Sequence, residues 1–394
     1  MTNEALLVLR CLGITDNSSS RVEIESLLSA GVDWRRVLSL VRANGVLPIF
    51  RENLLRYCPH AVPRSIRAQM QAEFQTCASL SIGYAHELVR VITCLQQGGI
   101  SAIAFKGPIL AQQLYGTFSL RQCRDVDILI EKNRFRQAID VLESAGYTPV
   151  WPKGQPKWEI LGSDKHVSVF SRARQYRVEL HWSLAMPESE FPLKFDDLWS
   201  RRDAVHVLGT SIDVPSREDL FLILCFHLAA HWWASLKWIC DIGELLRRYP
   251  DLNWQVVVER ARAWGCYRIM LTGVALARDT MAIDLPEQID RATKSDKAVI
   301  EISNDVLCRF SAGAYAPHCI QKPLDYIRSR ERLGDRLRLI VNFIRCRLKP
   351  NEHDREWVRL PDALSCLYIL VRIVRIARLR YKVSVIPLLK TIMS

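Results

Sequence analysis

Helical periodicity dominates the first hundred residues of the chain. The apolar positions within Val37–Val41 recur with the spacing of one helix face and follow Asp33, a residue type that commonly caps a helix start. The stretch Ala68–Gln97 contains no proline and has recurrent apolar positions up to Gly98. We therefore predict a helical N-terminal region that ends in a long helix.

The pattern changes at Ile100, where apolar runs become short and begin to alternate with polar residues. Such runs are typical of strands, and a proline directly after one suits the first position of a helix. We predict, in chain order, a strand at Ile100–Phe105, a helix at Ile109–Tyr115 preceded by Pro108, and a strand in the second half of Arg121–Ile130. A helix from Phe135 to Leu142 follows, which Asn133 caps and Gly146 ends. Two strands come last, at His166–Ser171 and Tyr176–Trp182, joined by a turn at Arg172–Gln175.

Helical periodicity returns after Ser216. Ser216–Tyr249 predicts two helices, Asn253–Trp264 predicts another, and further helical segments follow to Asp305. The fold class that we expect is α+β, with a small mixed β-sheet core flanked by N-terminal and C-terminal helical regions. The expected divisions are residues 1–98, 99–215, 216–320 and 321–394.

The composition is that of an ordinary folded protein, and most of the net positive charge lies in the C-terminal segment. Of 394 residues, 49% are hydrophobic and 24% are charged, which argues against disorder. The formal net charge is +12, but residues 321–394 contribute +10 of it. A basic excess can indicate nucleic acid, a membrane surface or a phosphate-bearing ligand. Because the rest of the chain is near neutral, we expect no nucleic-acid partner.

The basic excess includes a regular pattern near the C-terminus. Arg372, Arg375, Arg378 and Lys382 recur near one face of a predicted helix, with aliphatic residues opposite. This helix could pack on the body with a solvated basic face. It could also make peripheral contact with an anionic membrane or a phosphate-bearing partner.

The cysteines and the N-terminus bear on the compartment. The chain has 12 cysteines but no C-x-x-C pair, which excludes a zinc ribbon. Many lie inside apolar helical patterns, and Met1–Leu12 does not read as a signal peptide. No uncharged apolar run has the length of a membrane span. We therefore expect a cytoplasmic protein with reduced thiols.

The first candidate chemistry is a pair of carboxylates. Asp125 and Asp127 are two residues apart on a predicted strand, so their side chains leave the same face. Two carboxylates on an otherwise apolar strand repel each other unless a cation lies between them, and Mg²⁺ prefers such oxygen ligands. The simpler alternative is a strand end that shows two acids to solvent.

Neighbouring residues could complete a phosphate and metal site. Lys106 and Gly107 lie between a predicted strand and a helix start, where free N–H groups attract phosphate; a plain turn is the alternative. Arg177, Glu179 and His181 alternate on one strand face. Glu179 could join the aspartates as a third acid, and three carboxylates around metal could position a triphosphate and activate a hydroxyl.

The order of these motifs resembles a known superfamily. Lys106-Gly107, then Arg121-x-x-Arg124-Asp125-x-Asp127, then Val178–Trp182 resemble nucleotidyltransferases of the DNA polymerase β type, and more closely a bacterial branch of uncharacterised nucleotidyltransferases. The resemblance extends from about Leu6 to about Tyr381. Further segments that carry it are Val32–Trp34, Asn44–Pro48, Phe105–Gly116, Ala145–Tyr147, His227–His231 and Leu236–Ile242.

The resemblance implies roles for individual residues. Asp125 and Asp127 match the metal-binding pair, and Glu179 matches a third carboxylate that helps to activate the acceptor hydroxyl. Gly107 matches a glycine that lets a phosphate approach the backbone. The superfamily usually places Gly or Ser after that glycine, whereas Pro108 follows it here, and the spacing to the aspartates is longer than usual.

Five further residues are candidates for binding or support. Arg121 and Arg124 flank the metal pair and, with Lys106, could bind phosphates; the two arginines could instead pair with acids structurally. His227 and His231 have a spacing that can bind zinc on a helix, but we favour a core or substrate-facing role. Asp241 matches the family, and we expect a buried packing or hydrogen-bonding role for it.

These expectations define two alternative functions. The first is a nucleotidyltransferase that uses Mg²⁺ or Mn²⁺ and moves a nucleotidyl group from an NTP, expected to be ATP, to a hydroxyl of a small molecule, a peptide natural product or a protein. The second is a non-catalytic binding or scaffold protein on the same fold, with a basic docking tail. Retention of all three acids favours the first.

Overall fold

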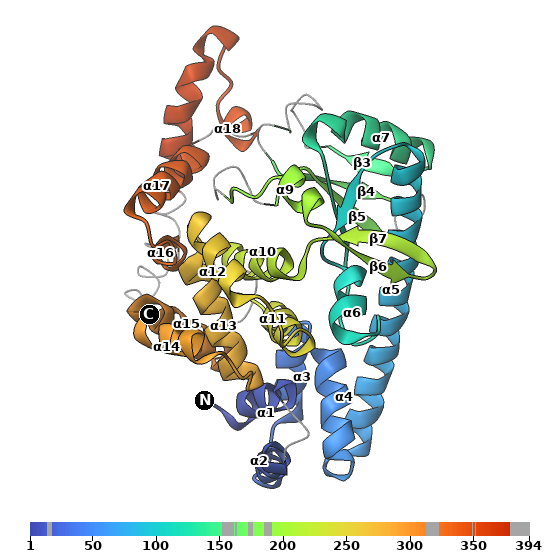
Figure 1. The fold of residues 1–394 in the computed structure, drawn as a ribbon. Helices are drawn as coiled ribbons and strands as arrows, with labels where there is room; N and C mark the ends of the chain where they lie inside the picture. The colour runs from blue at the N-terminus through green and yellow to red at the C-terminus, as the bar shows by residue number, and fades with distance from the viewer. Residues whose placement is uncertain are drawn as a thin grey trace.

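The structure, a computed structural model, describes residues 1–13, 18–151, 161, 164–171, 176–184, 191–312, 323–348, 350 and 352–378. Helices make up most of it, and the β-strands lie together in one half of the molecule with helices on both sides of them (Figure 1). The fold is therefore α+β, a mixed sheet with flanking helices, as the sequence predicts.

The main sheet has five strands in the order β1-β2-β5-β4-β3. Strand β2 runs parallel to β5, and the other neighbouring pairs are antiparallel. A separate antiparallel hairpin is formed by β6 and β7. The strands are β1 (Ala102–Ala104), β2 (Val126–Ile130), β3 (Thr148–Val150), β4 (His166–Phe170), β5 (Arg177–His181), β6 (Asp203–Val207) and β7 (Thr210–Val214).

Alternation along the strands gives the sheet one apolar face. Val126, Ile128 and Ile130 of β2 are completely buried and pack in one cluster with side chains of two helices, α5 (Arg64–Gln97) and α7 (Phe135–Ser144). Asp127 points to the opposite face, because successive side chains of a strand alternate. That second face is turned toward the C-terminal helices.

Most of the remaining helices pack around a single large core, whereas α17 and α18 project from it (Figure 1). That hydrophobic cluster contains residues from both the N-terminal region and the segment after Ser216. At the junction of α1 and α13, a side-chain carbon on Gly13 would lie 2.9 Å from the Cα of Met281. The helices are α1 (Asn3–Leu12), α2 (Ser18–Ser29), α3 (Trp34–Ala43), α4 (Leu47–Tyr57), α6 (Pro108–Tyr115), α9 (Phe195–Ser200), α10 (Arg217–Ala230), α11 (Leu236–Arg248), α12 (Trp254–Ala263), α13 (Tyr267–Met281), α14 (Glu287–Ser295), α15 (Lys297–Ser311), α16 (Pro323–Arg328), α17 (Leu333–Leu348) and α18 (Glu352–Trp357).

Most predicted elements are confirmed, with small shifts at their ends. Asp33 caps α3 by accepting hydrogen bonds from the backbone N–H groups of Arg35 and Arg36, and Pro108 occupies the first position of α6. The predicted turn at residues 172–175 lies outside the described residues. In the part of the chain that the structure describes, no helix combines the length and the hydropathy needed to cross a bilayer.

Two predictions about the elements are wrong. Asn133 does not cap α7, because it lies inside a short 3₁₀ turn (Lys132–Arg134) and Arg134 precedes the helix without a side-chain cap. The predicted order of the central segment also omits β3 and the β6–β7 hairpin. Strand β3 has only three residues and contains Pro149, so its sequence carries little strand signal.

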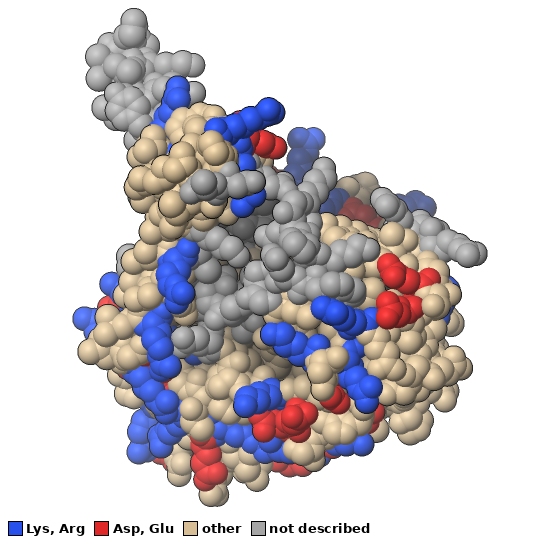
Figure 2. All heavy atoms as spheres, turned by 90° about the horizontal axis from the view of Figure 1, so that it is seen from above, with Lys and Arg blue, Asp and Glu red and all other residues tan. Residues whose placement is uncertain are grey.

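The structure contradicts one of the two interpretations of the basic C-terminal segment, whereas contact with a membrane or a phosphate-bearing partner stays a prediction. Lys382 lies outside the described residues. Residues 368–378 are helical. Arg372 and Arg375 lie 3.6 and 2.5 Å from the carboxylate of Asp354, which is completely buried. A solvated basic face is therefore wrong for these two arginines, whereas Leu370 and Val374 are 58% and 56% exposed. On the face drawn in Figure 2, Lys and Arg side chains gather along one side.

The described cysteines form no disulfide with one another. All those whose side chains are described are free, and most of them are buried. Their burial is typical of cysteine as a small apolar residue.

Candidate active site

Three carboxylates meet on the polar face of the sheet. The parallel pairing of β2 and β5 places Asp127 directly opposite Glu179. Asp125 lies just before β2 instead of within it, and it remains two residues from Asp127 on the same side. The structure therefore brings together the three acids that the sequence singled out.

Lys106 neutralises the innermost of these acids. It follows β1, and its Nζ lies 2.7 Å from Oδ1 of Asp127. Both side chains are buried, at 12% and 2% exposure respectively. Loss of either partner would be destabilising, because it would leave the other charge buried and unpaired.

Arg177 joins the other two acids. Its guanidinium donates a hydrogen bond of 2.8 Å to Asp125 and lies 3.5 Å from Oε1 of Glu179. Arg177 precedes Glu179 by two residues on β5, so the strand itself fixes both on one face. Each carboxylate at the site thus has a basic neighbour on an adjacent element or on its own strand.

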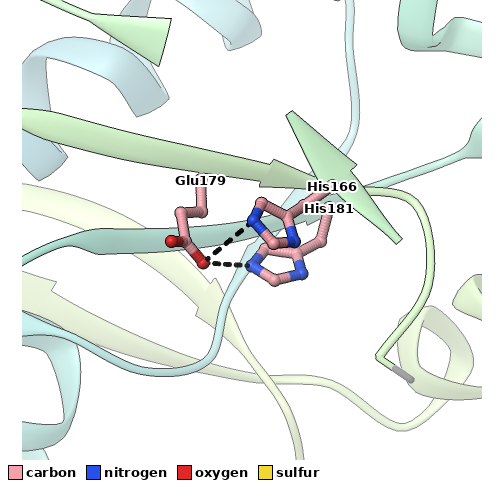
Figure 3. A group of neighbouring side chains, drawn as sticks. All are labelled: His166, Glu179 and His181. Carbon is pink, nitrogen blue, oxygen red and sulfur yellow. Dashed lines mark ion pairs between the residues drawn. The ribbon is translucent and has the colours of Figure 1, made fainter. Parts of the chain in front are cut away.

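Two histidines lie beside Glu179. In the antiparallel pairing of β4 and β5, His166 is directly opposite His181. The Nε2 atoms of His166 and His181 lie 3.6 and 3.4 Å from the same atom, Oε2 of Glu179 (Figure 3). His181 Nε2 also lies 3.2 Å from Oδ1 of Asp127, so the imidazole of His181 bridges two of the acids.

The surroundings give the acids different proton affinities. Burial alone would raise the pKa of Asp127, but the charge of Lys106 and the hydrogen bond with His181 outweigh it and lower the pKa. Burial and the charge of Asp127 raise the pKa of Asp125. Burial and the charge of Asp127 would raise the pKa of Glu179, but the neighbouring imidazoles of His181 and His166 together outweigh them and lower the pKa to about 2. At neutral pH, Asp127 and Glu179 are therefore firmly ionised.

The turn before α6 is built on Gly107. Its backbone has φ +67° and ψ −137°, a conformation that residues with a side chain rarely adopt. A side-chain carbon at this position would lie 2.5 Å from the carbonyl oxygen of Asp125. The glycine thus allows the chain before β2 to pass close to the start of α6. Whether a phosphate also approaches here stays a prediction.

Arg121 is held in the interior by Asp241 of α11. Its Nε and Nη2 donate hydrogen bonds of 2.7 and 2.9 Å to the two carboxylate oxygens of Asp241. Its Nη1 donates to the carbonyl oxygen of Gly107 at 3.1 Å. The two side chains are 4% and 0% exposed, and Tyr115 donates a further hydrogen bond to Asp241. The buried role expected for Asp241 is confirmed.

The two arginines that flank the aspartates therefore differ. The guanidinium of Arg121 pairs with an acid structurally, an alternative that the sequence left open. Arg124 is exposed, and among the described residues no carboxylate lies within ion-pair distance of it. A phosphate-binding role stays a prediction for both residues.

Helix α10 closes the site with a small cavity. The cavity has a volume of about 10 Å³, and basic, aromatic and aliphatic side chains line it, namely Phe105, Lys106, Lys165, His181, Leu184, Phe191, Ile223, Phe226 and His227. Burial, and then the charge of Lys106, lower the pKa of His227 well below its ordinary value. His227 and His231 lie with ring centroids 4.6 Å apart, and both contact Trp238. This placement is compatible with the core or substrate-facing role.

Sequence reasoning placed His181 on the correct strand face but gave it no role, and it missed His166 and Lys165. The alternation of β5 locates His181 next to Glu179. His166 reaches the site only through the pairing of β4 with β5, and that register is not readable from the residues of β4 alone.

Comparison with known proteins adds one finding. The sequence model of a family described as "Uncharacterised nucleotidyltransferase" matches residues 30–282, a segment that contains every residue of the site described above. A search of curated proteins found no match, and neither did a search of solved structures.

Proposed function

The chain belongs to the family of uncharacterised nucleotidyltransferases, and we propose that the polar face of its sheet transfers a nucleotidyl group from an NTP to a hydroxyl acceptor. The observation that carries the proposal is the register of two strands. It sets Asp127 opposite Glu179, with Asp125 joined to Glu179 through Arg177.

The donor set fits a hard divalent cation. Asp125, Asp127 and Glu179 offer carboxylate oxygens on one face, and such oxygens are the ligands that Mg²⁺ and Mn²⁺ prefer. We propose that these three residues hold the metal. When bound, the metal would neutralise phosphate charge and lower the pKa of a coordinated hydroxyl.

Basic residues beside the three acids are suited to bind the phosphates. Lys106 pairs with Asp127, the charge of Lys165 interacts with Glu179 and Asp127, and the first turn of α6 begins directly after Gly107. Lysine ammonium groups and free N–H groups at a helix start both attract phosphate. We propose that they position the triphosphate for in-line attack at the α-phosphorus, from which pyrophosphate leaves. ATP is the nucleotide that we propose.

Glu179 is proposed to orient the acceptor hydroxyl. With a pKa of about 2, its carboxylate accepts a hydrogen bond at neutral pH but is a weak base. Positioning of the hydroxyl oxygen toward phosphorus is therefore the larger part of its contribution. The acceptor class that we propose remains a small molecule, a peptide natural product or a protein.

Nucleotide binding and transfer test the proposal in the full-length protein. We expect Mg²⁺ with one NTP to raise the melting temperature of the wild type. At an NTP concentration of 100 times Kd, binding should stabilise the folded state by about 2.7 kcal/mol. Asp127→Asn should remove this shift and lower the transfer of α-labelled nucleotide to cell-extract acceptors by about 100-fold or more.

Asp140→Asn is the matched control, because Asp140 is exposed on α7, and it should behave as the wild type. Absence of a shift with each of the four NTPs would overturn the proposal and favour the scaffold alternative. Unchanged transfer by Asp127→Asn would exclude the proposed role of that residue.

Peripheral membrane contact is a separate proposal for the C-terminal segment. The exposed apolar side chains of residues 368–378 have counterparts on α17, where Leu333 and Leu337 are 69% and 55% exposed. Together with the local excess of basic residues, this pattern suits an anionic interface. Cosedimentation with phosphatidylserine vesicles but not with neutral vesicles is expected; equal recovery with both would contradict it.

A further inference from the structure

We infer that His166, Glu179 and His181 form a binding site for a transition-metal ion of the Zn²⁺ class. The site shares Glu179 with the proposed active site. The inference rests on the three side chains themselves and holds whether or not the protein transfers nucleotides.

The distances between the three groups suit ligands of one ion better than hydrogen bonds. Oε2 of Glu179 lies 3.6 Å from Nε2 of His166 and 3.4 Å from Nε2 of His181. A hydrogen bond between nitrogen and oxygen has a usual length of about 2.7–3.2 Å. By contrast, two ligands bonded at about 2.0–2.1 Å to a tetrahedral metal lie roughly 3.4 Å apart.

The sheet presents the three ligand atoms together. One atom from each residue falls within 4.8 Å of both others, and Figure 3 shows both imidazoles turning Nε2 toward the same carboxylate oxygen. His166 and His181 are register partners, and Glu179 precedes His181 by two residues on β5. Neighbouring strands hold such side chains at nearly fixed separation, so the site needs little rearrangement to close around an ion.

Burial is graded across the site. His181, Glu179 and His166 are 2%, 14% and 24% exposed, respectively. The ion would thus be held from the interior by His181 and approached from the side of His166. Three protein ligands leave a further coordination position for water or a ligand, as in catalytic zinc sites with two histidines and one glutamate.

The ligand types decide which ion is preferred. Imidazole nitrogen suits Zn²⁺, Co²⁺ and other first-row transition metals, whereas Mg²⁺ favours an octahedral set of oxygens and retains its water. The two oxygens of Glu179 also face different neighbours, since Oε1 lies toward Arg177 and Oε2 toward the histidines. One carboxylate could therefore serve this ion and the proposed NTP-bound Mg²⁺ from opposite sides.

Metal titration of the full-length protein tests the inference without an activity assay. After removal of metal with a chelator, Co²⁺ should bind at one equivalent and produce visible absorption bands. Zn²⁺ should abolish these bands, whereas millimolar Mg²⁺ should not. His166→Gln should weaken Co²⁺ binding at least 10-fold, because it removes one of three ligands.

Matched variants keep the result interpretable. His181→Gln could disturb folding because His181 is buried, so the isosteric Glu179→Gln provides the second ligand variant. His206→Gln changes an exposed histidine of β6 and should bind Co²⁺ as the wild type does. Circular dichroism melting of each variant verifies that it is folded.

Three results would overturn the inference. The first is no Co²⁺ binding by the wild type, and the second is unchanged Co²⁺ binding by both His166→Gln and Glu179→Gln. The third is loss of the bands in His227→Gln, which would place the ion at the histidine pair of α10. NTP transfer that depends on Asp127 without any Co²⁺ binding would leave the proposed function intact. Co²⁺ binding without NTP binding or transfer would support the metal site and contradict the proposed function.

Discussion

Gly107 shows how a single missing side chain shapes the site. Its φ of +67° would strain any residue with a Cβ. In addition, its Cβ position lies 2.5 Å from the carbonyl oxygen of Asp125, which is backbone and cannot rotate away. Two independent costs therefore fall on the same substitution, one from the torsion angle and one from the contact.

Gly107→Ala should lower the free energy of unfolding by about 2–5 kcal/mol, the sum of a positive-φ torsion cost of about 1–2 kcal/mol and an overpacking cost of about 1–3 kcal/mol. Gly116→Ala tests a positive φ without a close contact, in the left-handed helical region where ψ is 0° instead of −137°. Gly116 ends the same helix with φ +68°, but no atom lies within 4 Å of its Cβ position. Urea unfolding of both variants is the measurement, and equal losses would contradict the predicted contact.

At the scale of elements, a chain of contacts connects α11 to the turn before α6. Asp241 of α11 holds Arg121 by two hydrogen bonds, and Arg121 holds the carbonyl oxygen of Gly107. These groups are buried, so water cannot replace a lost partner. The position of α11 and the conformation of the turn are therefore fixed together.

Asp241→Asn should cost about 3–5 kcal/mol of unfolding free energy, because it leaves the guanidinium of Arg121 buried without a counter-charge. The double variant Arg121→Met with Asp241→Leu should recover part of this loss, since it removes both charges, although the Gly107 carbonyl still loses its donor. Urea unfolding of the three proteins tests this. A loss below about 1 kcal/mol for Asp241→Asn would mean that the pair is not the support described here.

The helices could be predicted from sequence because their signals are local. The cap of α3 at Asp33 and the proline at the start of α6 lie within one turn of the residues that they affect. Strand β3 lacked such a signal, and the cap expected at Asn133 failed because a 3₁₀ turn intervenes.

The candidate site was predictable only in part. Alternation along one strand placed Glu179 and His181 on a common face, which required no knowledge of neighbouring strands. The position of His166 depends on the register between β4 and β5. The position of Asp241 depends on the packing of α11, because Asp241 is 120 residues from its partner Arg121 in the sequence. Such long-range contacts leave no periodic pattern in the sequence.

At the scale of the whole molecule, His227 and His231 lie between the sheet and the C-terminal helices, close to several lysines. His227 lies in the cavity on α10, where burial and then the charge of Lys106 lower its pKa well below the ordinary value. Further positive or titratable groups near it are His231, Lys165 and Lys237. Burial and Lys165 lower the pKa of His231 to about 4. The folded protein therefore keeps both imidazoles neutral at a pH where the unfolded chain protonates them.

Stability should consequently fall as the pH decreases below about 6.5, the ordinary histidine pKa. In that range the unfolded state binds more protons than the folded state, so protonation favours unfolding. His227→Gln should have a flatter pH dependence than the wild type, although His231 preserves part of the slope. Urea midpoints at pH 7.5 and 5.0 measure this, with His206→Gln as the control; parallel slopes for the wild type and His227→Gln would contradict it.

The long sequence separations within the site determine when it can form during synthesis. Lys106 and Asp127 are 21 residues apart and emerge from the ribosome nearly together. Arg177 follows Asp125 by 52 residues, and Asp241 follows Arg121 by 120. Because a chain is made from its N-terminus, the sheet can be completed only after β5 has been translated. The contact of Arg121 with Asp241 can form only after α11 has been translated. A ribosome-bound chain that stops before Asp241 holds all three acids but leaves Arg121 without its partner, so a completed site marks a chain that has been translated at least through Asp241.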